Sequence, residues 1–276
     1  MPKFCANLTM LYGEHQFLDR FGAEARDGFA AVEYMFPYQF PKEQLVGALK
    51  AHRLTQVLHN LPAGDWDGGD RGIAVQPDRR EEFREGVACA VEYATALACQ
   101  HVNCLVGIPR IGDSSDVVRH TVVENLRYAA AELKKADVKL LIEPVNDKDI
   151  PGFWLTRADQ AVSVIEEVGS DNLFLQYDIY HQARMDGELT ATFRRLRDRI
   201  AHVQVADNPG RNEPGTGEIN YRFMFDMLDR EGYAGWIGCE YRPAASTSAG
   251  LGWAAAYLGR AVTRCPSSIS ARCLRN

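Results

Sequence analysis

The sequence lacks the cysteine and histidine spacings that indicate a disulfide framework or a zinc finger. It has seven cysteines, an odd number, with no CxxC pair, and only seven histidines. Cys89, Cys99, Cys104 and Cys239 lie in apolar or helical contexts, where a reduced cysteine behaves as a small hydrophobic residue. We therefore expect reduced thiols, as in a cytosolic protein.

Long apolar runs and an excess of basic charge are also missing. No run approaches the length of a membrane span, and the first residues contain no long apolar region of a secretory signal. The formal net charge is -6, whereas a protein that binds a phosphate backbone normally has a basic face. We expect a soluble cytoplasmic protein that binds neither nucleic acid nor membrane. Its oligomeric state is left open, and a homo-oligomer is compatible with the sequence.

What the sequence does contain is an alternation of short apolar runs with longer helical patterns. The runs of strand type cover residues 3–11, 31–36, 55–60, 101–106, 139–143, 173–180, 200–206 and 236–241. Eight strands alternating with helices over about 250 residues are typical of a (β/α)8 TIM barrel. A doubly wound open sheet is the alternative, but the first βα turn has no G-x-G-x-x-G phosphate loop.

Two segments depart from this alternation. Residues 61–77 are rich in Gly and Asp and are too long for an ordinary connection, so we expect a surface loop or a lid. A calcium loop is rejected there, because the glycine and the bidentate glutamate that such a loop needs are missing. Residues 254–276 form a divergent C-terminal segment that we expect to be partly disordered, since its end is rich in Ser and Arg without an apolar period. The barrel domain is therefore predicted over residues 1–253.

Oxygen-bearing side chains stand at the ends of the last four predicted strands. The apolar run 140–142 ends in a carboxylate and then in Pro144, which has no backbone N–H to extend a strand. Catalytic groups of such barrels lie where the strands end. From the fifth strand onward, those ends carry Glu143, Asp178, Gln204 and Glu240.

Each of these residues alone can be explained as a polar side chain that contacts solvent at a strand end. Together, the three carboxylates among them repel one another. Two carboxylates about 4 Å apart repel each other by about 4 kcal/mol at an effective dielectric constant of 20, and here three converge. A divalent cation removes that repulsion, and oxygen ligands without thiolate or imidazole suit Mg²⁺ or Mn²⁺ better than Zn²⁺. The ion would polarise a carbonyl while two carboxylates act as base and acid. The pattern predicts metal-assisted isomerisation through an enediolate.

Three further residues on this face are candidate substrate contacts. His59 ends the third strand and His181 follows Asp178, and we expect both to contact substrate or an oxyanion rather than act as essential bases. Arg211 lies in the Gly- and Pro-rich loop 207–218 and is suited to clamp a carboxylate through two hydrogen bonds. The alternatives are two structural histidines and a solvated loop arginine.

At these residues the chain resembles the hydroxypyruvate isomerase family of the xylose-isomerase-like barrel superfamily. The similarity runs from the N-terminus to about Trp253. From roughly Ala254 onward the sequence no longer resembles the family. The segments that carry it are 6–11, 32–38, 58–66, 142–146, 176–181, 202–208, 213–221 and 238–241.

The resemblance implies interconversion of hydroxypyruvate and 2-hydroxy-3-oxopropanoate (tartronate semialdehyde), a small 2-oxo acid reaction. It implies that Glu143 and Glu240 are the acid/base pair, with either able to begin the reaction, and that both bind the metal together with Asp178 and Gln204. Related ketose epimerases usually have histidine at the position of Gln204, so the glutamine indicates this branch of the superfamily.

Three alternatives remain beside this interpretation. The nearest is isomerisation or epimerisation of a longer 2-oxo acid or ketose such as 2-oxotetronate, which the motifs do not separate from hydroxypyruvate. The apurinic endonucleases of the same superfamily use several zinc ions held by many histidines, which the seven histidines and the charge of -6 disfavour. A non-catalytic metabolite-binding barrel would require a broken constellation, and this one is intact.

Overall fold

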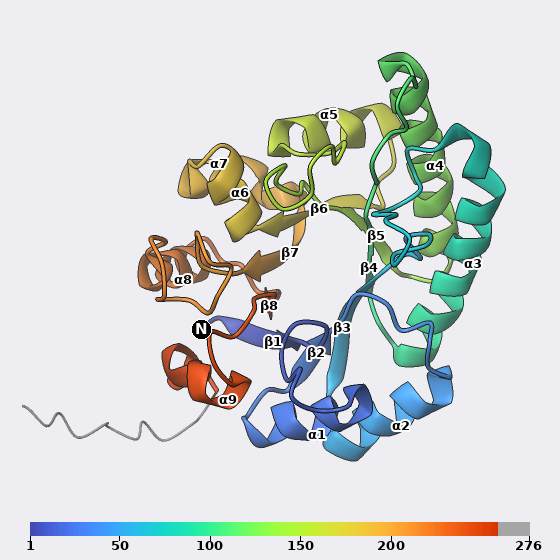
Figure 1. Cartoon of the computed structure of the whole chain (residues 1–276). Coiled ribbons are helices and arrows are strands. Elements are labelled where there is room, and N and C mark those ends of the chain that lie inside the picture. Colours follow the sequence, from blue (N-terminus) through green and yellow to red (C-terminus); the bar gives the residue numbers. More distant parts are fainter. Residues whose placement is uncertain (259–276) are drawn as a thin grey trace, which may run out of the picture.

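Eight parallel strands, joined in sequence order, close into a barrel in the computed structural model, which describes residues 1–258 (Figure 1). Each strand pairs with its neighbours in sequence, and the last strand pairs with the first. The predicted (β/α)8 barrel is therefore confirmed. The strands are β1 (Lys3–Asn7), β2 (Ala31–Glu33), β3 (Thr55–Asn60), β4 (His101–Cys104), β5 (Lys139–Ile142), β6 (Leu173–Asp178), β7 (Ile200–Val205) and β8 (Trp236–Cys239).

Helices surround the barrel and bury one apolar face each against the strands (Figure 1). They are α1 (Phe17–Arg26), α2 (Lys42–His52), α3 (Arg80–Leu97), α4 (Ser115–Lys135), α5 (Ala158–Val168), α6 (Ile179–Met185), α7 (Leu189–Leu196), α8 (Tyr221–Arg230) and α9 (Thr247–Gly250). Short 3-10 helices are η1 (Pro77–Arg79), η2 (Arg197–Arg199) and η3 (Leu251–Ala254). In the part of the chain that the structure describes, no helix has the length and apolar character that crossing a bilayer requires.

Most strands end earlier than the apolar runs predicted. Leu8 and Leu11 are fully buried although they follow β1, and Tyr34 is buried although it follows β2. The loops at the C-terminal ends of the strands are thus part of the core, so their apolar residues prolong the strand pattern. The same effect concealed α6, whose first residues Ile179 and Tyr180 are buried and were predicted as strand.

The helices α4 and α5 begin in different ways. Ser114 caps α4, because its hydroxyl accepts a hydrogen bond from the backbone of Val117. Arg157 is the N-cap residue of α5 and makes no side-chain cap bond, and the backbone N–H of Thr156 donates to the side chain of Gln160.

The loop between β3 and η1 is only partly a surface loop. Its inner residues 73–75 are buried, and the backbone N–H of Val75 donates to the carbonyl of Val106. Gly72 has a φ of +118°, and a Cβ at this position would lie 1.9 Å from the carbonyl oxygen of Leu105, so only glycine fits. The inner part of the loop is therefore fixed to the chain after β4, and a lid function for its outer part stays a prediction.

The chain after β8 packs onto the barrel further than residue 253. The rings of Trp253 and Tyr257 lie 5.0 and 5.1 Å from the ring of Phe4. The segment after β8 contains one α-helical turn, α9, followed by η3. The partial disorder predicted for the C-terminal segment concerns residues 259–276, which lie outside the described part, and it stays a prediction. The five cysteines of the described part are free.

Candidate active site

The strands carry two kinds of buried residue. Cys5, Ala31, Val57, Leu58 and Leu141 form a small cluster of buried apolar residues. Toward the C-terminal ends of the strands the buried residues are polar, and because side chains alternate between the two faces of a strand, they come from every second position. They include Asn7, Glu33, Asn103, Gln176, Asp178 and Gln204.

Glu143 and Asp178 form the centre of this polar end. Glu143 directly follows β5 and Asp178 is the last residue of β6. Both are buried, and Glu143 Oε1 and Asp178 Oδ2 have no hydrogen-bond partner among the described residues. Together with His181 they offer ligand atoms that all lie within 4.8 Å of one another. Two buried carboxylate oxygens without partners are costly unless a cation or a proton occupies the space between them.

Gln204 and Glu240 adjoin this pair through hydrogen bonds. Gln204 Nε2 donates to Glu240 Oε2 at 2.6 Å, and Gln204 Oε1 accepts from Gln176 Nε2 at 2.6 Å. Gln176 also contacts Glu143. Asp178 of β6 pairs with Gln204 of β7, and Gln204 pairs with Gly238 of β8. Glu240 therefore lies two residues further along the chain than the residue of β8 that is level with Gln204. The structure nevertheless brings the four predicted strand-end residues into one connected group.

This group has an excess of buried negative charge. Burial raises the pKa of Glu143 well above its usual range, and the charges of Glu240 and Asp178 raise it further. Burial also raises the pKa of Asp178 to about 6 and that of Glu240 to about 8, although the nearby Arg211 lowers both. The cause is shared, since ionised carboxylates are being held together away from water.

A divalent cation fits this donor set. Glu143 Oε1 and Asp178 Oδ2 are carboxylate oxygens of the site that are buried without a partner, and Gln204 Oε1 retains a lone pair beside its bond to Gln176. Glu240 adds a second glutamate at hydrogen-bond distance from Gln204. Carboxylate and amide oxygens without thiolate are the ligands that Mg²⁺ and Mn²⁺ prefer.

His181 lies beside the two carboxylates as a neutral hydrogen-bond donor. Its Nε2 is 3.8 Å from both Glu143 Oε1 and Asp178 Oδ2. Its Nδ1 faces the backbone N–H of Asn146 at 3.3 Å and the side-chain Nδ2 of Asn146 at 2.6 Å. Because donors face Nδ1, we assign the proton to Nε2. Burial lowers the pKa of His181 well below its usual range, and the charges of Arg211 and Arg184 lower it further.

Arg211 reaches the group from the loop after β7. Its Nη2 donates to Glu240 Oε1 at 2.6 Å, its Nη1 lies 3.5 Å from Asp149 Oδ2, and its guanidinium lies over the ring of Tyr180. Asp207 fixes this loop, because its carboxylate accepts backbone N–H groups from Gly215 and from three further loop residues, Asn208, Gly217 and Ile219. The guanidinium is thus held by the fold rather than solvated.

His59 is the exception among the predicted site residues. Its ring lies 6.0 Å from the ring of Tyr38, and the backbone of Ala90 on α3 is beside it. The neighbouring Asn60 faces the barrel interior, where Asn103 donates to it, so His59 points to the helix side of β3. The expected substrate contact of His59 is therefore corrected to a position in the outer core.

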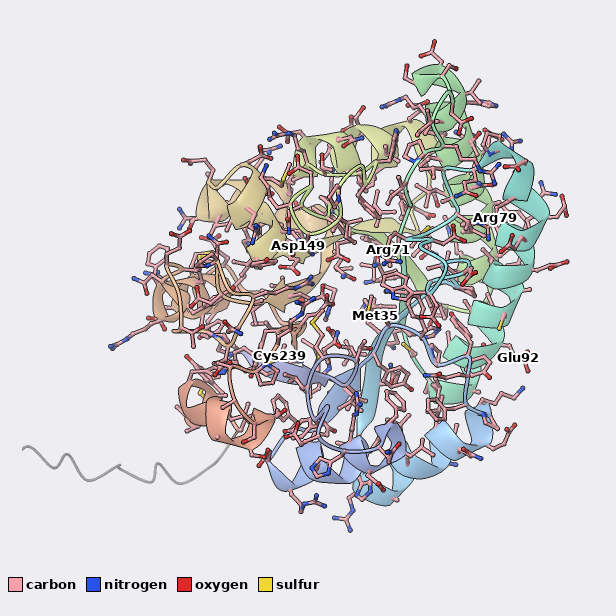
Figure 2. All side chains as sticks on the ribbon, in the orientation of Figure 1. Met35, Arg71, Arg79, Glu92, Asp149 and Cys239 are labelled. Carbon is pink, nitrogen blue, oxygen red and sulfur yellow. The ribbon has the colours of Figure 1, made fainter. Side chains whose placement is uncertain are left out.

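Several polar residues of the site were not singled out from the sequence. Asn103 donates to Glu143 at 3.2 Å and Asn7 donates to Glu240 at 3.2 Å. Asp149 and Arg71 lie on opposite sides of the barrel opening (Figure 2). For Gln176 a signal existed, since it precedes Asp178 by two positions and must share its face of the strand. For the asparagines, a single polar letter inside an apolar run gives no such direction.

Comparisons with known proteins identify the family of this chain. The family model described as a xylose isomerase-like TIM barrel matches residues 21–257. The chain is 55% identical over 253 residues to the hydroxypyruvate isomerase of Escherichia coli (strain K12), with 92% of this chain and 98% of that protein covered. It is 46% identical over 261 residues to the 2-oxo-tetronate isomerase of Cupriavidus necator, with 94% and 100% covered.

A solved structure from Brucella melitensis, described as an AP endonuclease of family 2, superposes with a TM-score of 0.91 at 42% identity. The superposition covers 93% of this chain and 99% of the Brucella chain. With the family match and these relatives, the resemblance predicted from the sequence is confirmed, and the chain belongs to the xylose isomerase-like TIM barrel family.

Proposed function

We propose that this protein is a hydroxypyruvate isomerase that interconverts hydroxypyruvate and 2-hydroxy-3-oxopropanoate. The observation that carries the proposal is the pair of unpartnered buried oxygens on Glu143 and Asp178, with a second glutamate, Glu240, connected to them. The 55% identity to a hydroxypyruvate isomerase supports the choice of substrate. The five free cysteines support a reducing, cytoplasmic location.

The proposed metal ligands are Glu143, Asp178, Gln204 and Glu240, with Mg²⁺ or Mn²⁺ as the ion. When bound, the ion supplies Lewis-acid polarisation of the substrate carbonyl and stabilises the negative charge that follows proton loss. Its charge would offset the burial and the mutual repulsion that raise the pKa values of these carboxyl groups.

The proposed proton transfer uses the two glutamates. One takes a proton from C3 of hydroxypyruvate, the C3–H electrons form the C2–C3 double bond, and the π electrons of the C2 carbonyl move to O2 to give an enediolate. The proton of the C3 hydroxyl passes to O2. The C3=O bond then forms while the electrons of the C2–C3 double bond take up a proton at C2 from the other glutamate. Glu143 and Glu240 are suited to these steps because they lie on different sides of the group, after β5 and after β8. The glutamate that acts as base in one direction acts as acid in the reverse direction.

Arg211 and His181 are the proposed substrate contacts. The Arg211 guanidinium donates to Glu240 and its charge also acts on Glu143, and a planar guanidinium matches a carboxylate. The Nε2–H of His181 points between Glu143 and Asp178, where it is suited to donate to a substrate oxygen. Burial keeps this ring neutral, so it donates without adding charge.

A second candidate is the isomerisation of a 2-oxotetronate, which the 46% identical relative from Cupriavidus necator favours. Both substrates are 2-oxo acids that undergo the same proton transfer, and they differ only in the length of the carbon chain. The same residues would serve either substrate.

The test is a substrate panel with metal-stripped protein and added Mg²⁺, Mn²⁺ or Co²⁺. We expect turnover of hydroxypyruvate that depends on metal and exceeds that of 2-oxotetronate. Faster turnover of the four-carbon acid would select the second candidate, and turnover of neither acid would contradict both. Abasic DNA belongs in the panel because of the description of the Brucella protein, and we expect no cleavage of it by a chain of net charge -6.

A further inference from the structure

A second buried acidic group lies next to the candidate metal site. It consists of Cys5 on β1, Glu33 on β2 and His202 on β7, all of them buried. His202 Nε2 is 2.6 Å from Glu33 Oε2, and Cys5 Sγ is 3.4 Å from the same oxygen. In contrast to Glu143 and Asp178, both oxygens of Glu33 have partners.

The other oxygen of Glu33 is bound by two side-chain amides of the site. Glu33 Oε1 accepts from Asn7 Nδ2 at 3.0 Å and from Gln204 Nε2 at 2.7 Å. The same two amide groups also donate to Glu240 Oε2, at 3.2 and 2.6 Å. Gln204 Nε2 thus uses both of its hydrogens on carboxylates, one on each side.

These bonds determine which end of the Gln204 amide faces the candidate metal site. A carboxylate only accepts hydrogen bonds, so Glu33 and Glu240 require the nitrogen end of the amide. The oxygen end then faces Gln176 Nε2, a donor that also contacts Glu143. A flipped amide would place an oxygen against two carboxylates and a nitrogen against another amide nitrogen, which is repulsive at both ends.

The backbone leaves space for Glu33 to hold this position. A Cβ at Gly238 of β8 would lie 2.4 Å from each carboxylate oxygen of Glu33, a distance that no side chain tolerates. Gly238 thus leaves room for the Glu33 carboxylate, and the hydrogen bond from His202 holds it at hydrogen-bond distance from Gln204.

We propose that Glu33 is a positioning residue that orients the Gln204 amide, so that its oxygen rather than its nitrogen faces the metal ion. This inference rests on the proposed metal site and adds a residue that does not itself touch the ion. Partners of this kind behind a metal ligand typically change metal affinity by about 10–100-fold when they are replaced.

The test is Mn²⁺ affinity measured by titration calorimetry on the metal-stripped protein. Glu33→Gln keeps the shape of the side chain but can present its own amide to Gln204, which permits the flip. We expect the Mn²⁺ dissociation constant to rise about 10–100-fold. The matched control is Glu24→Gln, a second fully buried glutamate, located on α1, for which we expect a change of less than about twofold.

A double variant separates orientation from general damage. Glu33→Gln combined with Gln204→Glu keeps the number of charges and places oxygen at both ends of side chain 204, so orientation no longer matters. We expect its Mn²⁺ affinity to return to within about fivefold of the wild type. We also expect the loss caused by Glu33→Gln to be smaller in the Gln204→Glu background than in the wild type, a comparison that cancels the effect of the carboxylate added at position 204. If Glu33→Gln alone does not fold, the double variant is compared with Gln204→Glu: equal Mn²⁺ affinities support the inference, because the orientation of side chain 204 no longer matters, and a loss of about tenfold or more contradicts it.

The remaining outcomes are also decisive. Wild-type affinity in Glu33→Gln, or a loss that the double variant fails to recover, would overturn the role of Glu33 while leaving the metal site in place. A wild-type protein that binds no Mn²⁺, Mg²⁺ or Co²⁺ would instead contradict the proposed function itself, and the inference with it.

Discussion

Two buried groups of ionisable side chains lie in this barrel, and they differ in how their oxygens are satisfied. The first, which we call the open group, contains Glu143, Asp178 and His181, and two of its carboxylate oxygens have no partner among the described residues. The second, the closed group, contains Glu33 with His202 and Cys5, and both Glu33 oxygens are hydrogen-bonded. Burial is nearly complete in both, so burial does not distinguish them.

The pKa values of the two groups shift in opposite directions. Burial and neighbouring negative charge raise the pKa of Glu143 well above its usual range. Burial acts on Glu33 in the same direction, but the charge of His202 and the hydrogen bonds from His202, Gln204 and Asn7 outweigh it and lower the pKa. The pKa of each carboxylate follows its surroundings: Glu33 has hydrogen-bond donors at both oxygens, whereas the open group has two oxygens without a donor and neighbouring negative charge.

The largest effect should follow from removing one carboxylate of the proton-transfer pair. Glu143→Gln and Glu240→Gln are each expected to lower kcat for hydroxypyruvate by about 10²–10⁴-fold, because general acid–base catalysis contributes this much. The measurement is steady-state turnover at saturating metal, together with a melting curve showing that the variant is folded. Near-full turnover in either variant would refute the assignment of the pair.

A smaller effect is expected at Arg211, which supplies positive charge to the open group. Arg211→Lys keeps the charge but loses the planar, forked geometry, and a hydrogen bond to a charged group contributes about 1.5–3 kcal/mol. We expect KM for hydroxypyruvate to rise about tenfold or more. Arg199→Lys, in an exposed ion pair with Glu166, is the control and should leave KM unchanged. Equal KM values for all three proteins would remove Arg211 from the substrate contacts.

The closed group can be disturbed through Gly238. In Gly238→Ala the added methyl group would overlap the carboxylate of Glu33, so we expect a loss of about 1–3 kcal/mol in the free energy of unfolding. Gly47→Ala on α2 is the matched control, because a Cβ there meets nothing within 4 Å and alanine favours the helix by about 0.5–1 kcal/mol. Chemical denaturation measures both, and equal effects would contradict the close packing around Glu33.

The opposite pKa shifts predict an opposite pH dependence of stability. In the metal-stripped protein the folded state holds protons on Asp178, with a pKa of about 6, and on Glu240, with a pKa of about 8. Groups with raised pKa values contribute stability below the ordinary carboxyl pKa, and this contribution is lost as the pH rises through the folded values. The pKa of Glu33 is lowered, so its contribution is lost only as the pH falls.

We therefore expect the melting temperature of the metal-stripped protein to fall between about pH 5 and pH 8. Mn²⁺ should restore stability, and more at the higher pH, because the ion binds the ionised carboxylates. Thermal melts over this pH range with and without Mn²⁺ are the measurement. A melting temperature that rises steadily toward pH 8 without metal would contradict the raised pKa values.

The smallest effect is expected at His59, which belongs to neither group. His59→Gln should leave kcat/KM for hydroxypyruvate within about twofold of the wild type, since the ring lies against Tyr38 and α3 rather than in the barrel. A rise in KM of tenfold would return His59 to the substrate contacts.

Much of the architecture could be predicted from the sequence because strand and helix periodicities alternate over its whole length. The polar residues at the C-terminal face could be predicted as well, since a carboxylate after a buried run, as at Glu143, marks where a barrel strand meets the site, although most strands end earlier than their apolar runs. The helix α6 could not, because Ile179 and Tyr180 continue the apolar pattern of β6 and are buried like strand residues. Periodicity does not separate a short buried helix from a strand.

The facing of single residues was harder to predict than the elements themselves. His59 was assigned to the wrong side of β3, where the pairing with β2 shifts by one residue and the apolar run offers no alternation to read. The role of Glu33 was also beyond the sequence, because its partners Asn7, His202 and Gln204 come from three other parts of the chain. Only the closed barrel brings them within hydrogen-bond distance.

The most direct test of the central claim, that the open group transfers a substrate proton with the help of a metal ion, is solvent deuterium exchange. Hydroxypyruvate is incubated in D₂O with metal-stripped protein, with and without Mn²⁺, and the product is analysed by NMR. We predict deuterium on the carbon next to the carbonyl only when the metal is present, and its loss in Glu143→Gln. Product formed without deuterium, or exchange that is independent of metal, would contradict the account.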